Sequence, residues 1–282
     1  TTPKPVKKTE PLRKPEEKGD PITLAKKKSL LKLADLLFEQ NEVAQSGQVA
    51  RRGLQAIMRG TGTLSLEQVE RNKIMMFLGQ AIDAQTNGND ALAAENLEKA
   101  IDSGLTNNAA FFDLGLLRYQ SDQIESSVKY LTYAIKHPDF ALAAHLMLGM
   151  AYRKLNRPVE AGVEYLQALK YADSEVSGGD QADELIQLYE PLIEEQGKTV
   201  DIAASEKLCE SIGSQLQSID WRENLRKARE QLPEQPAGST PLPLAEIFLE
   251  LRSHQIIDSL STVRALANRG KYRTAMEEAF FA

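Results

Sequence analysis

The sequence predicts an all-α protein, an α-solenoid of stacked antiparallel helix pairs. Beyond the first residues of the chain, hydrophobic side chains recur with helical spacing almost everywhere, and no segment shows the alternation of a β-strand. Small and large residues also return at a fixed interval of 34 residues, which is typical of stacked helical repeats. Aromatic residues make up only 6% of the chain, so Ala and Leu have to fill most of the core.

The N-terminal segment differs from the rest of the chain in charge and proline content. Residues 1–28 contain nine Lys or Arg and four acidic residues, so this segment carries +5 and the remainder −11 of the net charge of −6. Five of the twelve prolines lie within the first 21 residues. We interpret residues 1–28 as extended and solvated, with a disordered Lys/Pro-rich tail or linker over residues 1–23. The alternative is contact of this basic segment with anionic lipid, nucleic acid or the acidic body of its own chain.

Residues 24–63 are predicted to form an N-terminal helical hairpin. Two stretches with helical hydrophobic spacing follow one another, and the second ends at a glycine. The first face consists of Leu30, Leu33, Ala34, Leu37 and Phe38, and the second of Val49, Ala50, Leu54, Ile57 and Met58.

Residues 64–173 are predicted to form three units of two helices each, joined by polar turns. A small residue lets neighbouring helices cross closely, and a large residue opposite fills the remaining space. Four columns with this character repeat every 34 residues: Ala81, Gly115 and Gly149; Ala93, Ser127 and Ala161; Leu97, Leu131 and Tyr165; and Ala100, Ala134 and Ala168.

These units resemble tetratricopeptide (TPR) repeats. The family pattern has large, large-small and aromatic positions on the first helix of a unit, and small, aromatic and small positions on the second. The resemblance covers about residues 74–173. It implies a right-handed superhelix whose first helices line a concave groove for partner proteins. The third unit matches best, through Leu148-Gly149, Tyr152, Ala161, Tyr165 and Ala168.

The C-terminal part is predicted to contain further helices and one linker. Residues 174–232 carry helical spacing, and four prolines with one glycine mark residues 233–243 as a linker. Residues 244–282 resemble a C-terminal helix pair that ends in the middle of a TPR-like unit. Because a terminal repeat needs a polar outer face, an end at Phe280-Phe281-Ala282 leads us to expect further repeats beyond this segment.

The resemblance places the partner-binding residues on the first helices. Most of the implied groove positions are apolar, which suits an amphipathic helix with anchors at i, i+3, i+4 and i+7. The positions that bind acidic chaperone tails in some TPR proteins carry no cation here, so that ligand is disfavoured. The implied groove residues are Leu78, Ile82, Gln85, Phe112, Leu116, Tyr119, Leu146, Met150 and Arg153.

Two other interpretations of these apolar positions stay open. The later helices of the chain, within residues 202–232, are natural candidates to cover the groove. The same positions could instead belong to the core if the register differs by one residue.

No catalytic, metal or cofactor motif is found, so we expect no enzyme activity, cofactor or metal. The single cysteine, Cys209, cannot form an internal disulfide and favours a reducing compartment, the cytoplasm. It is expected to be buried and structural. The three histidines, His137, His145 and His254, show no metal-site spacing. No run is long enough to span a bilayer, so membrane contact is expected only through the basic tail.

The sequence therefore predicts a scaffold or adaptor that binds a protein partner, most simply an amphipathic helix or an extended peptide. The net charge of −6 argues against nucleic acid as the main partner. The alternatives are a regulatory TPR module of a larger enzyme, sensor or transcription regulator, and an accessory protein of a membrane or pilus assembly system.

Overall fold

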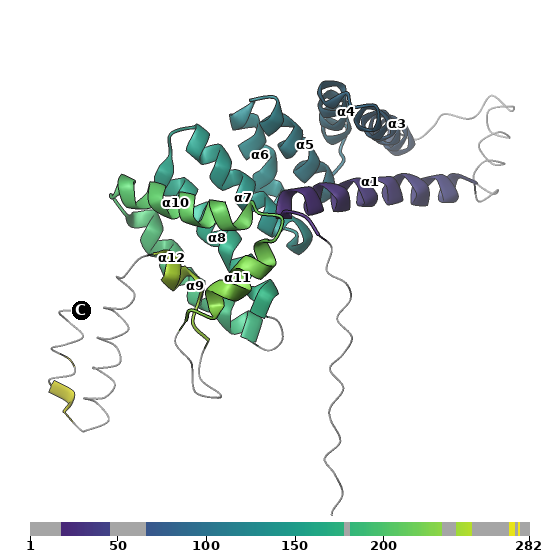
Figure 1. Ribbon diagram of the computed structural model, residues 1–282. Coiled ribbons are helices and arrows are strands. Elements are labelled where there is room, and N and C mark those ends of the chain that lie inside the picture. The colour runs from purple at the N-terminus through teal and green to yellow at the C-terminus, as the bar shows by residue number, and fades with distance from the viewer. Residues whose placement is uncertain are drawn as a thin grey trace, which may run out of the picture.

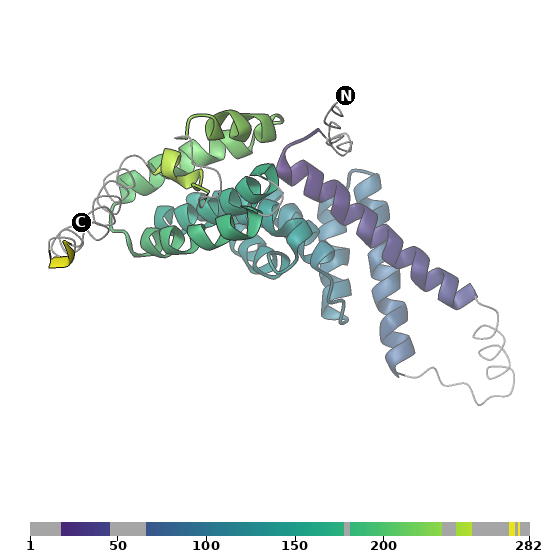
Figure 2. The same cartoon turned by 90° about the horizontal axis from the view of Figure 1, so that it is seen from below.

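The computed structural model describes residues 18–45, 66–177, 181–232 and 241–249, together with 271–273 and 276. Every regular element among these residues is helical, so the predicted all-α class is confirmed. The helices pack side by side into an elongated body that α1 crosses near one end (Figure 1, Figure 2). In chain order they are α1 (Pro21–Gln45), α3 (Leu66–Thr86), α4 (Asp90–Asp102), α5 (Asn108–Gln120), α6 (Ile124–Ala134), α7 (Pro138–Lys154), α8 (Pro158–Ser177), α9 (Gln181–Lys198), α10 (Ile202–Leu216), α11 (Trp221–Arg229) and α12 (Ala245–Phe248).

The same kind of turn connects the two helices in each of three pairs, α3/α4, α5/α6 and α7/α8. Each turn contains a residue in the left-handed region, Gly88 (φ 73°), Asp122 (φ 60°) and Asn156 (φ 57°), and these positions are 34 residues apart. Such a residue ends a helix and lets the next backbone N–H bond back to a free carbonyl. The predicted period is therefore present in the backbone as well as in the side chains. The three bonds are Asn89 N–H to Ala84 O (2.8 Å), Gln123 N–H to Arg118 O (2.9 Å) and Arg157 N–H to Tyr152 O (2.9 Å).

The small residues of the repeat allow close helix contact within each pair. A Cβ atom added at Gly115 of α5 would lie 2.8 Å from the side chain of Leu131 on α6. At Gly149 of α7, the corresponding distance to the ring of Tyr165 on α8 is also 2.8 Å. Both distances are shorter than real Cβ contacts, so these helices approach because the side chain is absent. In the first of these pairs the buried Ser127 hydroxyl also donates to the Gly115 carbonyl at 2.7 Å.

Helix α1 begins earlier than the sequence predicts. The Asp20 carboxylate accepts the backbone N–H groups of Ile22 (3.0 Å) and Thr23 (3.1 Å), which caps the first turn. Pro21 occupies the first helical position, where a missing N–H removes no helical bond. Residues 21–28 are thus helical and not extended, and the lysines at 26–28 lie on α1. The second helix of the predicted hairpin, at 49–58, lies outside the described residues.

The C-terminal helices gather around α8. Helices α7, α9 and α10 pack along it, and α11 and α12 contact it as well. The buried Tyr165 ring of α8 lies between two glycines, Gly149 on α7 and Gly213 on α10. The α7/α8 pair is therefore continued by a cap of four helices.

A buried carboxylate ties this cap together. Asp173 of α8 is fully buried and accepts hydrogen bonds from the Tyr189 hydroxyl (2.8 Å) and the Leu244 backbone N–H (2.9 Å). Arg229 of α11 forms an ion pair with the same carboxylate. One side chain thus joins α8, α9, α11 and the segment before α12, and its charge is compensated by three donors.

The segment that follows the predicted linker packs onto the same core. Leu244 and Ala245 are buried in one hydrophobic cluster with residues of α8 and α10. Residues 241–249 are thus part of this body. Most of the predicted C-terminal pair, beyond Leu249, lies outside the described residues.

The close crossing of α7 and α8 gives a testable prediction. We expect Gly149→Ala to lower the free energy of unfolding by about 1–3 kcal/mol, because the buried Tyr165 ring has no room to move away. Chemical denaturation followed by circular dichroism measures this change.

The matched control is Gly79→Ala on α3. A Cβ there meets no atom within 4 Å, so the higher helix propensity of Ala should raise stability by about 0.5–1 kcal/mol. Equal effects of the two substitutions would contradict the close crossing at Gly149.

Candidate partner-binding surface

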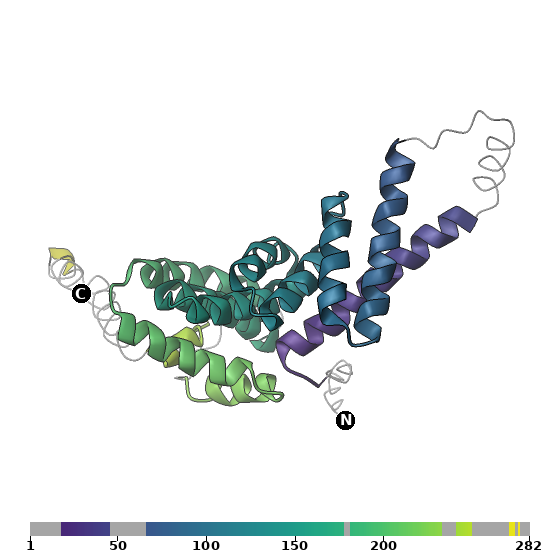
Figure 3. The same cartoon turned by 90° about the horizontal axis from the view of Figure 1, so that it is seen from above.

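Helix α1 lies across the first helices of the three pairs, α3, α5 and α7 (Figure 3). Its buried residues Ala25, Ser29 and Leu33 are spaced by four, so they form one stripe along the helix. Ala25 and Leu33 belong to the same hydrophobic cluster as Leu78 of α3 and Phe112 of α5. An amphipathic helix of the chain itself therefore shares a core with the helices that the sequence analysis assigns to the groove.

The nine groove residues inferred from the resemblance fall into two groups. A buried residue is out of reach of a partner in the present arrangement of helices. The buried group consists of Leu78, Phe112, Leu116 and Leu146, and the more accessible group of Ile82, Gln85, Tyr119, Met150 and Arg153.

Two lysines and one aspartate fasten α1 to the beginning of α7. Lys28 lies 2.9 Å from one Asp139 oxygen, and Lys32 lies 2.5 Å from the other. The hydrogen bonds from Lys32 and Lys28 lower the pKa of Asp139 to about 2. The Lys32 ammonium also lies 5.3 Å from the ring centroid of Phe140, which stacks on Phe112 with centroids 5.3 Å apart. The contact thus combines ion pairs of the two lysines with Asp139 and an apolar part formed by the stacked Phe140 and Phe112.

A buried carboxylate lies on α5 among these first helices. Asp113 is fully buried and accepts a hydrogen bond from the Gln85 amide nitrogen. Its other oxygen has no partner among the described residues, and neither has the Gln85 carbonyl oxygen. Burial raises the pKa of Asp113 to about 6, although the bond from Gln85 and the charge of Lys26 act in the opposite direction. The face therefore contains two polar side chains, Asp113 and Gln85, that the fold leaves poorly satisfied.

The later helices reach the other end of the predicted groove. Arg153, at the end of α7, lies 3.5 Å from Glu210 of α10. Met150 packs against the cluster that contains Leu208 and Ile212 of α10. The segment 202–232 thus contacts Met150 and Arg153, whereas α1 shares a cluster with Leu78 and Phe112.

Sequence reasoning missed α1 as the covering helix. The predicted face of Leu30, Leu33, Ala34, Leu37 and Phe38 includes only one residue that is buried, Leu33, and Phe38 is 69% exposed. The buried stripe begins instead at Pro21, four residues before Ala25, and includes a serine, which hydrophobic spacing does not detect. The available signal was the four-residue spacing of small side chains at positions 25 and 29, which lie beside the three lysines.

The cysteine and the two described histidines, which are the side chains most often used in catalysis, are buried or bonded to neighbouring residues. Cys209 is buried, as predicted, and burial raises the pKa of its thiol to about 11. His145 lies 2.6 Å from Glu164, and His137 caps α7 by accepting the Asp139 backbone N–H. The part of the chain that the structure describes contains no cluster of three His, Cys, Asp or Glu side chains that could hold a metal ion.

No helix within the described ranges is long and apolar enough to cross a membrane. Comparison with models of protein families, with curated proteins and with solved structures finds no match.

The poorly satisfied Asp113 gives the next prediction. A carboxyl whose pKa rises from about 3.9 in the unfolded chain to about 6 on folding costs no stability below about pH 4. The cost of its buried charge grows between about pH 4 and pH 6 and is complete above pH 6. An amide avoids this cost and can also donate to Gln85. We expect Asp113→Asn to raise the free energy of unfolding by about 1–3 kcal/mol at pH 7.5 and by about half as much at pH 5.

Thermal or urea unfolding at a series of pH values measures this difference. The exposed Asp83→Asn on α3 is the control, with an expected change within about 0.5 kcal/mol at every pH. A loss of stability in Asp113→Asn at pH 7.5 would show that the negative charge itself is needed.

Proposed function

We propose that this protein is an interaction scaffold of the TPR type whose first helices bind an amphipathic helix. The observation that carries the proposal is the position of α1, which lies across α3, α5 and α7 with one stripe buried. In this reading α1 is the helix bound in cis, and a partner helix takes its place when α1 is displaced.

The assignment to the TPR class is supported by the repeated turn. Gly88, Asp122 and Asn156 share a left-handed conformation at intervals of 34 residues, which is the period of the family pattern. The small-to-large contacts of Gly115 and Gly149 support it further. We assign the protein no catalytic step, and its single buried cysteine suits a reducing compartment such as the cytoplasm.

The chemistry of the α1 contact indicates which partner fits. The face offers buried apolar side chains, among them Leu78 and Phe112, and one carboxylate at its edge, Asp139. A suitable helix has small or apolar residues every three to four positions and lysines beside them, as α1 has Lys28 and Lys32. The expected partner is therefore a basic amphipathic helix.

The test uses the full chain and a labelled synthetic peptide of residues 18–45. The double variant Ala25→Glu/Leu33→Glu places two charges in the buried stripe and should displace α1. Because α1 in cis has an effective concentration of order millimolar, the wild type should exclude the peptide. The variant should bind it at least about tenfold more tightly, as measured by fluorescence anisotropy.

The control is Leu31→Glu, which places a glutamate on the exposed side of α1. This variant should exclude the peptide as the wild type does. Failure of a well-folded double variant, checked by circular dichroism, to bind the peptide would refute the groove as a site for a helix.

A further inference from the structure

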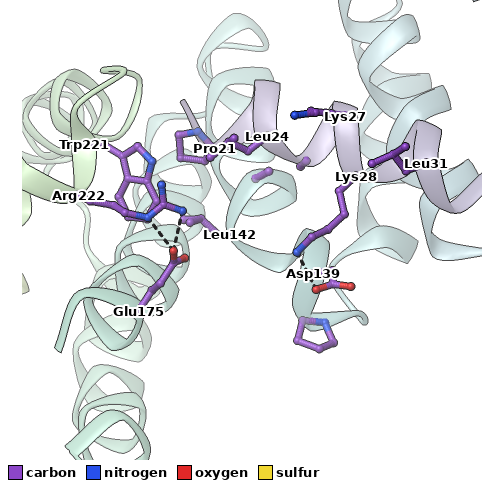
Figure 4. A pocket seen from close by; sticks show the side chains of 13 residues that line it. Pro21, Leu24, Lys27, Lys28, Leu31, Asp139, Leu142, Glu175, Trp221 and Arg222 are labelled. Carbon is purple, nitrogen blue, oxygen red and sulfur yellow. Dashed lines mark hydrogen bonds and ion pairs between the residues drawn. The ribbon is translucent and has the colours of Figure 1, made fainter. Parts of the chain in front are cut away.

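A cavity of about 450 Å³ lies where α1, α7, α8 and α11 meet (Figure 4). Leu24 and Leu31 of α1, Leu142 of α7 and Trp221 of α11 provide its apolar walls. Leu31 is 58% exposed, so part of this apolar surface remains open to solvent. The cavity adjoins the α1 contact described above and shares Ala25, Lys28 and Asp139 with it, but Ser29 and Leu33 of the buried stripe do not line it.

The cavity has more positive than negative charge around it. Three cations line it, Lys27, Lys28 and Arg222, against two carboxylates, Asp139 and Glu175. Asp139 is moreover shared between Lys28 and a further lysine, Lys32. This local excess of cations contrasts with the net charge of −6 of the whole chain. An anionic group on a ligand fits this arrangement.

Arg222 and Trp221 form an ordered pair at the wall. Two nitrogens of Arg222 lie 2.8 and 2.7 Å from one oxygen of Glu175, and the guanidinium lies 4.4 Å from the Trp221 ring centroid. Stacking and the ion pair together fix a cation on an aromatic surface. A carboxylate that arrives at Arg222 thus meets a group already in position.

The Trp221 side chain contains a buried donor without an acceptor. The residue is 1% exposed, and its indole nitrogen has no hydrogen-bond partner among the described residues. Figure 4 shows the indole with Pro21 and Leu24 of α1 opposite it. A peptide carbonyl that enters the cavity would supply an acceptor for this N–H group.

We infer that this cavity binds a short acidic peptide segment of a partner protein. An apolar side chain of the peptide lies against Leu31 and Leu142, a carboxylate binds at Arg222, and a backbone carbonyl accepts from the Trp221 indole. The carboxylates of Asp139 and Glu175 disfavour the dense negative charge of nucleic acid or of an anionic membrane. A peptide carries fewer and more widely spaced carboxylates, so it meets less of this repulsion.

This inference extends beyond the proposed function because it does not use the face of α3 and α5. It does use α1 as one wall. The cavity is complete only while α1 is docked, so displacement of α1 removes the acidic-peptide site and opens the helix site.

Intrinsic fluorescence tests the inference directly, because Trp221 is the only tryptophan of the chain. The full-length protein is titrated with the acetylated peptide Glu-Asp-Leu-Phe-Asp-Glu. We expect a saturable change in tryptophan emission. The peptide Lys-Lys-Leu-Phe-Lys-Lys and the peptide Glu-Asp-Ser-Ser-Asp-Glu should each bind at least about tenfold more weakly.

Two variants and a matched control locate the binding. Arg222→Gln and Leu31→Glu should each weaken binding by about tenfold. Lys227→Gln on the same helix α11, which is exposed and does not line the cavity, should leave it unchanged. Leu31→Glu is also the variant expected to retain the docked α1, so its result separates failure at this cavity from failure of the helix site.

Three results would overturn the inference. The first is the absence of a saturable emission change, and the second is equal binding of the acidic and the basic peptide. The third is stronger Arg222-dependent binding of phosphatidylserine vesicles or a single-stranded oligonucleotide than of the acidic peptide, which would assign the cavity to phosphate ligands instead.

Discussion

The contact of Gly149 with Tyr165 is the constraint on which most of this body depends. Tyr165 fills the space that the glycine leaves on α7, and its far edge lies against Gly213 of α10. One ring therefore sets the spacing of α7, α8 and α10 at once. The equivalent contact of Gly115 with Leu131 sets the preceding pair. Since each pair has a fixed spacing, the first helices α5 and α7 are held side by side, and α1 finds a continuous surface.

Much of this framework could be predicted from the sequence, because its signals are local and periodic. Glycine and polar turn residues at 88, 122 and 156 and the small residues facing large ones depend only on contacts within one pair. The position of α1 depends on contacts with residues more than 100 positions away, such as Lys28 with Asp139. Its buried stripe includes Ser29, so hydrophobic spacing alone identified only Leu33 of that stripe.

Two buried aspartates show where the fold is rigid and where it is not optimised. Asp173 is surrounded by donors from α9, α11 and the backbone at Leu244, so its charge joins distant segments. Asp113 has one donor, Gln85, and an oxygen without any partner. Buried groups of the first kind stabilise one arrangement, whereas those of the second kind reduce its stability. The charge of Asp173 is thus well satisfied in the cap around α8, whereas the contact of α3 with α5 contains a poorly satisfied pair, Gln85 and Asp113.

The two sides of α1 border different sites, and this arrangement has a consequence for binding. Leu33 lies in the core with α3 and α5, Leu24 and Leu31 line the cavity with Trp221, and Ala25 borders both. Under the two proposals above, a ligand in the cavity binds only the docked state of α1, and a partner helix on the first helices binds only the displaced state. Each ligand therefore lowers the affinity of the other by the same factor, because the coupling of two binding equilibria is reciprocal. A scaffold built in this way would exchange one partner for another and would not assemble both.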